Sequence, residues 1–233
     1  MTNKYNFKQS QKTKKLLIFG NSDMARMAHF YFDNDSSYEV VAFTIDEAYI
    51  NSATFCNLPL VPFHKIKILY PNTDFECFVA VGYKQMNLIR ERFYLKVLEC
   101  GYKTPSYISS KATILTSDIG DNCFIFEDNT LQPFVKIGNN TILWSGNHIG
   151  HDSVIEDNCF ISSHVVISGH CSVGKNCFVG VNSTIANNVK ISDFCYLSMS
   201  AIVAKDLPKF SLVKYDGSQS IVNVKVLEKI TSL

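Results

Sequence analysis

An aliphatic residue recurs at every sixth position through the centre of this chain. The series runs without a slip through fifteen residues: Ile119, Ile125, Leu131, Ile137, Leu143, Ile149, Ile155, Ile161, Ile167, Val173, Val179, Ile185, Ile191, Leu197 and Val203. A period of six matches neither an amphipathic helix, with about 3.6 residues per turn, nor a half-buried strand, with a period of two. It matches a chain that turns a corner every six residues, so that three corners close a triangular coil.

A second series of small or narrow residues follows the aliphatic one four positions later. Its members are Cys123, Asn129, Val135, Thr141, Asn147, Ser153, Cys159, Val165, Cys171, Cys177, Ser183, Val189, Cys195 and Ala201. We therefore predict a parallel β-helix in which the aliphatic residues fill the interior and the small residues fit beside the corners. At about 18 residues per coil and about 4.8 Å between strands, fifteen hexads give about five coils and a height of roughly 24 Å.

The corners of such a coil need residues that tolerate left-handed backbone angles. Asn and Asp tolerate them best, and polar pairs in the repeat end on Asn122, Asn140, Asn158 and Asn188, which we expect at the bends. The hydrophobic positions of a β-helix are explained by packing alone, so function has to be inferred from other residues.

Strands and helices alternate in the first hundred residues. The apolar runs and turn residues predict strands at 14–19, 39–45 and 77–81 and helices at 24–32 and 85–99. This alternation predicts a small, Rossmann-like α/β domain with a parallel sheet. The chain then divides into an α/β domain at 1–107, a β-helix at 108–206 and a C-terminal tail at 207–233.

Ligands of parallel sheets bind beyond the carboxyl ends of the strands. The candidates at these ends are Gly20, Asn21, Ser22, Asp46, Gly82, Lys84 and Asn87. Backbone N–H groups at a helix start, with the Ser22 hydroxyl, suit a phosphate, and Asp46 suits a ribose or base. The G-x-G-x-x-G fingerprint is absent, and simple helix capping by Ser22 and Asp23 is the plainer interpretation. Together these ends predict a nucleotide-sized crevice, with Arg90 and Arg92 expected as solvated helix charges.

Composition narrows the choice of partner and compartment. The 22 Lys and Arg against 21 Asp and Glu leave a formal charge of +1, without the basic excess of a nucleic-acid binder. The polar N-terminus resembles no signal peptide, and no apolar stretch reaches the length of a membrane span. We expect a cytoplasmic protein with a small-molecule partner, no nucleic acid and no membrane. Its eight cysteines then read as reduced thiols, mostly small buried fillers.

Four histidines lie close together in the repeat: His148, His151, His164 and His170. His151 is the third residue of its hexad, where the side chain faces outward, and one coil away it stacks beside Gly169 and Pro133. These small neighbours leave room for a substrate, and imidazole is the natural general base near neutral pH. We expect His148 at a corner in contact with water, and His164 and His170 at fourth positions with surface or subunit-contact roles.

Metal chemistry is an alternative use of the same histidines. His148, His151 and a third histidine from a neighbouring chain are a conceivable zinc ligand set, as in β-helix hydratases such as the gamma-type carbonic anhydrases. The spacing specifies no such set, so we expect no metal. A binding protein without catalysis is a further alternative on this scaffold.

The hexads, the preceding α/β domain and the segment 149–155 resemble the bacterial sugar acyltransferases of the PglD and NeuD type. The resemblance covers the chain from Lys14 to about Lys205. It implies that the β-helix is left-handed and that three chains form a homotrimer. It also implies that the α/β domain holds the nucleotide of a nucleotide-linked sugar, while acetyl-CoA lies in the groove between neighbouring helices.

Carried over residue by residue, the family's catalytic base falls on His151 and its acidic neighbour, usually Glu, falls on Asp152. The positions near the coenzyme are Gly169, Gly180, Val181, Met199 and Ala201, mostly through backbone groups. Two features depart from the family: Phe160 stands where some relatives carry a second histidine, and the segment 214–218 replaces the usual G-x-P-A ending.

The resemblance implies an acetyl-CoA-dependent N-acetyltransferase that acts on a nucleotide-linked amino sugar, a precursor of a surface polysaccharide such as lipopolysaccharide. In that mechanism His151 removes a proton from the sugar nucleophile as it attacks the thioester, and backbone N–H groups stabilise the oxyanion. A sugar O-acetyltransferase of the sialic-acid type is the alternative, with the same base, and a metal-dependent hydratase is a remote one.

Overall fold

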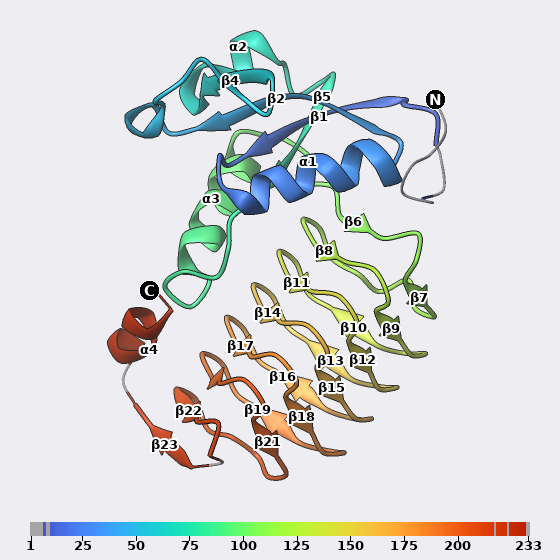
Figure 1. Cartoon of the computed structure of the whole chain (residues 1–233), viewed down its shortest axis with the longest axis vertical. Coiled ribbons are helices and arrows are strands. Elements are labelled where there is room, and N and C mark those ends of the chain that lie inside the picture. Colours follow the sequence, from blue (N-terminus) through green and yellow to red (C-terminus); the bar gives the residue numbers. More distant parts are fainter. Residues whose placement is uncertain (1–6, 8–9, 217, 223, 232–233) are drawn as a thin grey trace.

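The computed structural model describes residue 7 and residues 10–216, 218–222 and 224–231. An α/β domain sits against the upper coils of a triangular prism of stacked coils, and the chain ends in a short helix beside the lower coils (Figure 1). This is the predicted architecture of a small parallel sheet followed by a parallel β-helix.

The α/β domain holds a five-stranded sheet in the order β3-β4-β2-β1-β5. The strands are β1 (Lys14–Phe19), β2 (Tyr38–Ile45), β3 (Thr54–Phe55), β4 (Leu58–Pro62) and β5 (Phe75–Val79), and only the β3 to β4 pair is antiparallel. The helical segments are α1 (Asp23–Asp35), η1 (Glu47–Tyr49), η2 (Phe63–Lys65), α2 (Ile66–Leu69) and α3 (Leu88–Glu99). The three predicted strands are confirmed to within two residues, whereas β3 and β4 were not foreseen.

The second predicted helix starts later than expected. Gln85, Met86 and Asn87 have φ of +52°, +52° and +66°, which is left-handed backbone, so α3 begins only at Leu88. Non-glycine residues rarely adopt this conformation, and three in succession need support from outside the loop. Part of it comes from α4 (Val224–Ile230), because the Met86 N–H donates to Thr231 Oγ1 just past that helix (2.9 Å).

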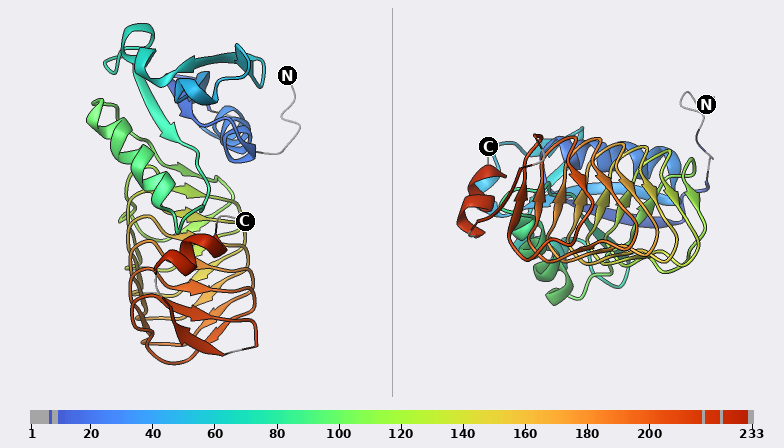
Figure 2. Two further views of the ribbon diagram at one scale, coloured as in Figure 1. Left: turned by 90° about the vertical axis from the view of Figure 1, so that its left-hand side faces the viewer. Right: turned by 90° about the horizontal axis from the view of Figure 1, so that it is seen from below.

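The prism has three faces of short parallel strands (Figures 1 and 2). The first face stacks β6 (Tyr107–Ile108), β8 (Phe124–Ile125), β11 (Ile142–Leu143), β14 (Phe160–Ile161), β17 (Phe178–Val179), β20 (Tyr196–Leu197) and β22 (Ser211–Val213), with β23 (Gln219–Ile221) antiparallel at its end. The second face stacks β7 (Thr113–Ile114), β9 (Thr130–Leu131), β12 (His148–Ile149), β15 (Val166–Ile167), β18 (Thr184–Ile185) and β21 (Ile202–Val203). The third face stacks β10 (Lys136–Ile137), β13 (Val154–Ile155), β16 (Ser172–Val173) and β19 (Lys190–Ile191).

The hexad interpretation is confirmed by burial and by backbone angles. The aliphatic and small series together form one buried core along the prism. Left-handed residues recur every six positions, including the four predicted bend residues Asn122, Asn140, Asn158 and Asn188. All eight cysteines are free thiols, and five of them lie buried in this repeat, as predicted.

Strand pairing runs beyond the hexad series at both ends. β6 precedes its first member and β22 follows its last, the latter inside the segment predicted as a tail. The predicted boundaries at 107 and 206 stay predictions. Residues 217, 223, 232 and 233 of that tail lie outside the described residues.

The α/β domain is fixed to the prism by aromatic packing and by buried polar groups. Phe32 and Phe78 pack with Tyr107 and Phe124 of the first face. At the corner between the third and first faces, Asn122 pairs with the backbone of Val79 through its Oδ1 and Nδ2 atoms. These contacts set the position of every pocket in the domain relative to the coils.

Arg90 is buried at the same corner, which corrects the expectation of a solvated helix charge. Its guanidinium donates to the carbonyls of Gly82, Asn140, Asn158 and Cys159 and to Asn87 Oδ1, at 2.9 to 3.1 Å. Burial lowers the pKa of Arg90 to about 10. The carbonyls of the coils therefore satisfy a cation that the sequence presents as an ordinary surface residue.

None of the described helices is both long and apolar enough to cross a lipid bilayer.

Candidate active site

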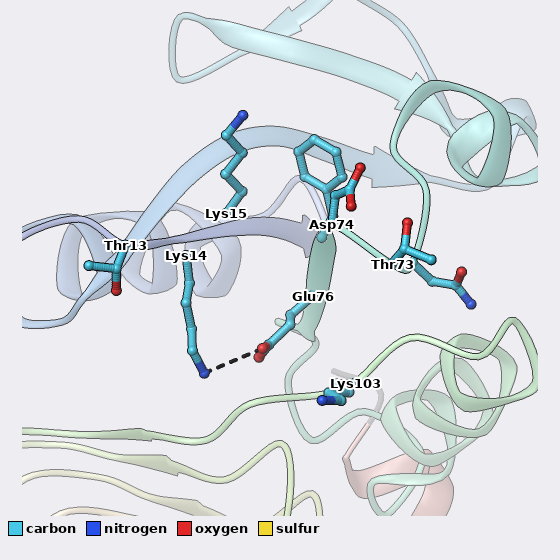
Figure 3. A pocket seen from close by; sticks show the side chains of 9 residues that line it. Thr13, Lys14, Lys15, Thr73, Asp74, Glu76 and Lys103 are labelled. Carbon is cyan, nitrogen blue, oxygen red and sulfur yellow. Dashed lines mark hydrogen bonds and ion pairs between the residues drawn. The ribbon is translucent and has the colours of Figure 1, made fainter.

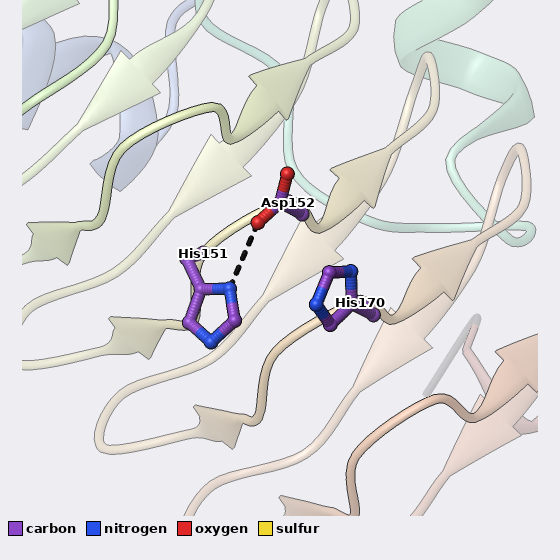
Figure 4. A group of neighbouring side chains, drawn as sticks. All are labelled: His151, Asp152 and His170. Carbon is purple, nitrogen blue, oxygen red and sulfur yellow. Dashed lines mark hydrogen bonds and ion pairs between the residues drawn. The ribbon is translucent and has the colours of Figure 1, made fainter.

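His151 stands at the corner between the second and third faces, directly after β12. Its side chain points out of the prism and is 52% exposed, and its Nδ1 lies 2.8 Å from Asp152 Oδ2 (Figure 4). The His151 backbone N–H donates to Gln132 Oε1 (2.9 Å). Because a carboxylate only accepts hydrogen bonds, this pairing keeps the proton on Nδ1 and leaves the lone pair on Nε2, the arrangement of a general base.

Gly169 lies beside the imidazole on the next coil, as the hexad register predicts. A Cβ at this position would lie 2.7 Å from His151 Nε2, so only glycine leaves the ring in place. His170 follows at a left-handed corner; its N–H donates to the His151 carbonyl (2.9 Å), and the two rings meet edge to face with centroids 4.9 Å apart.

The other two histidines lie elsewhere. His148 was expected at a corner, but it is part of β12 and pairs with Thr130 and Val166 on the second face. His164 occupies the left-handed corner between the first and second faces. His148 therefore lies on the second face and not at the corner with His151, so the suggested ligand pair does not form a cluster at that corner.

An apolar groove of ≈ 430 Å³ lies on the lower first face and its corner with the second face. Three predicted coenzyme residues line it: Gly180, Val181 and Met199. Ala201 is only 1% exposed and packs in the prism core, which leaves no side-chain surface for a ligand. Gly169 lies next to His151 at the opposite corner of the second face, where this face meets the third.

Aromatic side chains form the floor of the groove. Phe160, Phe178 and Tyr196 occupy the same position on three successive coils, and their rings stack at interplanar angles of 11° and 9°. Tyr83 of the α/β domain covers the first two of these rings, with centroids 4.9 and 4.8 Å away. Phe160, which stands in place of a histidine of some relatives, thus belongs to an apolar stack.

A second cavity of ≈ 480 Å³ opens at the carboxyl ends of β1, β2 and β5. Five of the seven predicted substrate residues line this crevice: Gly20, Asn21, Ser22, Asp46 and Lys84. Gly82 and Asn87 face the interior contact instead, where they accept hydrogen bonds from Arg90. The Ser22 side chain makes no capping bond to α1, contrary to the plainer interpretation.

Sequence reasoning missed two residues with polar side chains that line the crevice. Tyr49 follows Asp46 by three residues in η1, and Arg92 reaches in from α3. Arg92 was expected as a solvated charge, and its one available signal was its place on the helix that follows a strand end. Asp46 forms an ion pair with Lys96 at the edge of this crevice.

Tyr83 and Lys84 are adjacent in sequence but line different cavities. Tyr83 contributes to the groove and Lys84 to the crevice, so the left-handed loop before α3 joins the two. Arg90 holds this loop through the Gly82 carbonyl (3.0 Å).

A third cavity of ≈ 490 Å³ lies at the opposite, amino-terminal edge of the sheet (Figure 3). Its walls mix both charge signs, with Lys15, Asp74 and Lys103 among the lining residues and with Lys14 paired to Glu76 (3.4 Å). The edge is the wrong one for ligands of parallel sheets, which bind at the carboxyl ends of strands. We assign this cavity no part in the site.

The fold and the site define a class of protein, a left-handed parallel β-helix of hexapeptide repeats with an N-terminal α/β domain. Residues 116–151, 134–169 and 152–187 match the family model of the bacterial transferase hexapeptide (six repeats). The windows begin 18 residues apart, the length of one coil. A search of curated protein sequences gives no match to this chain.

Solved structures share both parts of the fold. Perosamine N-acetyltransferase from Caulobacter crescentus, a variant in complex with CoA and GDP-perosamine, is 19% identical with a TM-score of 0.78, over 91% of this chain and 99% of that one. The acetyltransferase domain of PglB from Neisseria gonorrhoeae is 17% identical with a TM-score of 0.74, over 86% and 96%. WeeI from Acinetobacter baumannii is 19% identical with a TM-score of 0.74, over 90% and 100%. These matches confirm the resemblance drawn from the sequence and the fold class that it implied.

Proposed function

We propose that this protein is an acetyl-CoA-dependent N-acetyltransferase that acts on a nucleotide-linked amino sugar. The observation that carries the proposal is the outward-pointing His151 imidazole, held by Asp152 on a hexapeptide coil, in a chain whose α/β domain has a crevice of nucleotide size. The perosamine N-acetyltransferase that shares this fold is described in complex with CoA and GDP-perosamine, which supports the same pair of substrates here.

In the proposed reaction the sugar amine attacks the thioester carbonyl of acetyl-CoA. The C–N bond forms as His151 Nε2 takes a proton from the amine, and the Asp152 carboxylate stabilises the imidazolium through Nδ1–H. The C–S bond then breaks, and CoA leaves as the thiol with the proton that the imidazolium returns. Backbone N–H groups along the groove stabilise the oxyanion in between. No residue of the chain is acylated.

The crevice offers a different group for each part of a nucleotide. Lys84 and Arg92 supply positive charge for the phosphates, and Asp46 is an acceptor for ribose hydroxyls. Tyr49, 68% exposed at the mouth, is placed to stack on a base. The sugar then extends past Lys84 toward Tyr83 and the aromatic groove.

Within one chain, His151 and the groove lie at opposite edges of the second face. This face exposes apolar side chains, among them Val166 and, at 71%, Ile202, with Met199 at its edge (68%). These exposed apolar side chains support an interface on this face. In a homotrimer with the second face toward the axis, one corner of each prism meets the other corner of the next. His151 of one chain then lies beside the groove of its neighbour.

We place the reaction in the cytoplasm, where acetyl-CoA and nucleotide sugars are available, and assign it to a precursor of a surface polysaccharide. Residues His151 and Asp152 are the proposed catalytic pair. Gly169, Gly180, Val181 and Met199 are the proposed coenzyme contacts, to which Ala201 contributes only backbone.

The deciding experiment measures release of free CoA thiol with UDP-, dTDP-, GDP- and CMP-linked amino sugars, each beside its hydroxyl counterpart. We expect one amino sugar to stimulate thiol release and the His151→Asn variant to lower turnover by about 10²- to 10⁴-fold with coenzyme binding retained. Stimulation by a hydroxyl sugar alone would make the protein an O-acetyltransferase. Unchanged turnover in His151→Asn would remove this residue from the mechanism.

A further inference from the structure

The His151 corner carries a third potential ligand that the proposed mechanism does not use. His170 lies on the next coil, at the position equivalent to Asp152, since the two residues are 18 positions apart and both have left-handed backbone. One ligand atom from each of His151, Asp152 and His170 lies within 4.8 Å of the others (Figure 4). All three residues are exposed in the single chain.

We propose that His151, Asp152 and His170 form a binding site for a transition-metal dication such as Zn²⁺, and that the bound ion inhibits the enzyme. The binding part stands on the three side chains alone. The inhibitory part rests on the proposed function, because it assumes that His151 is the base.

The geometry suits a metal after a small adjustment of side chains. Ligand atoms on a tetrahedral zinc, at about 2.0 to 2.1 Å from the ion, lie about 3.4 Å apart. Rotation of exposed side chains closes the difference from the observed spacing without moving the coils. The imidazole already lies against Gly169, where a Cβ would be 2.7 Å from Nε2, so a glycine here keeps the ring free of a side-chain clash.

The chemistry of the donors selects the ion. Two imidazoles and one carboxylate favour Zn²⁺, Cu²⁺, Ni²⁺ or Co²⁺, whereas Mg²⁺ and Ca²⁺ prefer sites built from oxygen. Three protein ligands leave at least one coordination position open. The site therefore differs from the hydratase arrangement considered from the sequence, because it uses His170 of the same chain and not His148.

Inhibition follows from the electronic structure of imidazole. A neutral imidazole has one lone pair, and a ring that gives this pair to a metal cannot accept a proton from the sugar amine. Whichever nitrogen of His151 binds the ion, general-base catalysis is lost. Occupied metal sites and active sites are thus mutually exclusive.

The test compares His170→Asn with His164→Asn in the full-length protein. Both histidines occupy left-handed corners, and asparagine adopts this conformation readily, so both variants keep the coil intact. Zn²⁺ binding is measured by calorimetry and Co²⁺ binding by visible absorption, with Mg²⁺ as the control ion. We expect wild type and His164→Asn to bind alike, and His170→Asn to bind at least about tenfold more weakly, since losing a direct ligand costs no less than losing a supporting one.

Equal Zn²⁺ affinity in His170→Asn and wild type, or no affinity in wild type beyond that for Mg²⁺, would overturn the site. The effect of Zn²⁺ on enzyme activity is measured separately from Zn²⁺ binding. We expect Zn²⁺ to suppress thiol release by wild type and His164→Asn, EDTA to restore it, and His170→Asn to resist. Binding without inhibition would overturn the inhibitory role. A protein without transferase activity still reports on the site through the binding arm.

Discussion

The prism and the α/β domain differ in how their structure is encoded. In the prism each residue has an equivalent 18 positions away, and the same choice of aliphatic, small and left-handed residues is made on every coil. In the α/β domain, each loop conformation is set by residues that occur once, as in the loop 82–87, which has no repeated equivalent. The register of the stacked strands is therefore set many times over by the same residue pattern. The pockets of the α/β domain, by contrast, depend on single residues.

The prism is expected to tolerate substitutions of side chains that face outward and to lose stability when side chains that face the interior are replaced by polar ones. Ile161→Asp places an unpaired carboxylate among fully buried side chains. We expect this to lower the free energy of unfolding by several kcal/mol, which is comparable to the total for a typical domain. Ser172→Asp, on the outer side of the third face, is the control and is expected to change stability by less than about 0.5 kcal/mol. Soluble yield and the thermal midpoint measure both. A folded Ile161→Asp protein with an unchanged midpoint would contradict the interior assignment.

The junction between the two regions is expected to depend on one cation. Arg90→Ala removes five hydrogen bonds and leaves the buried carbonyls of Asn140 and Asn158 without this donor, which we expect to cost about 2 to 4 kcal/mol in the free energy of unfolding. It also releases the loop that carries Tyr83 and Lys84, so the KM for the acceptor rises more than the KM for acetyl-CoA.

Urea unfolding and substrate kinetics measure these two effects, with Arg26→Ala as the matched control. Arg26 forms an exposed ion pair with Asp23 (3.0 Å), and such pairs contribute little. If Arg90→Ala and Arg26→Ala unfolded at the same urea concentration, Arg90 would not be the anchor described above.

The spacing of the coils sets the position of the catalytic ring. Gly169→Ala puts a methyl group only 2.7 Å from His151 Nε2, so the imidazole shifts by a few tenths of an ångström. Since a displacement of about 1 Å costs roughly 10²-fold, we expect turnover to fall about tenfold, with the thermal midpoint nearly unchanged. Full turnover in this variant would show that the ring works in another position.

Substitution of a single side chain that lines the crevice is expected to change the affinity for the nucleotide sugar. Lys84→Ala removes one cation from the proposed phosphate site, and we expect the KM for the nucleotide sugar to rise about tenfold while turnover stays within about twofold. Lys65→Ala, on η2 outside the crevice, is the control. An equal effect of both changes on KM would point to the general field of the domain and not to Lys84.

Sequence reasoning predicted the prism, the His151 corner and five of the residues that line the crevice, because each follows from local spacing. It failed at Arg90 and Asn87, whose partners are coil residues 50 to 90 positions away, such as Asn140 and Cys177. No local pattern distinguishes a helix arginine that meets water from one that meets carbonyls of a distant corner. The left-handed loop before α3 was missed for the same reason, since its support comes from residues such as Thr231 at the far end of the chain.

Mixed trimers test most directly whether His151 of one chain serves the groove and crevice of the next. Chains with His151→Asn lack the proposed base, and chains with Lys84→Glu carry a negative charge in the proposed phosphate site, so we expect little activity from either pure trimer at low acceptor concentration. The two chains are co-expressed with different tags and the mixed species is purified. We predict that one of the three sites in each purified mixed trimer combines an intact histidine with an intact neighbouring crevice, so that thiol release returns. Mixed trimers as inactive as their two parents would contradict a site shared between chains.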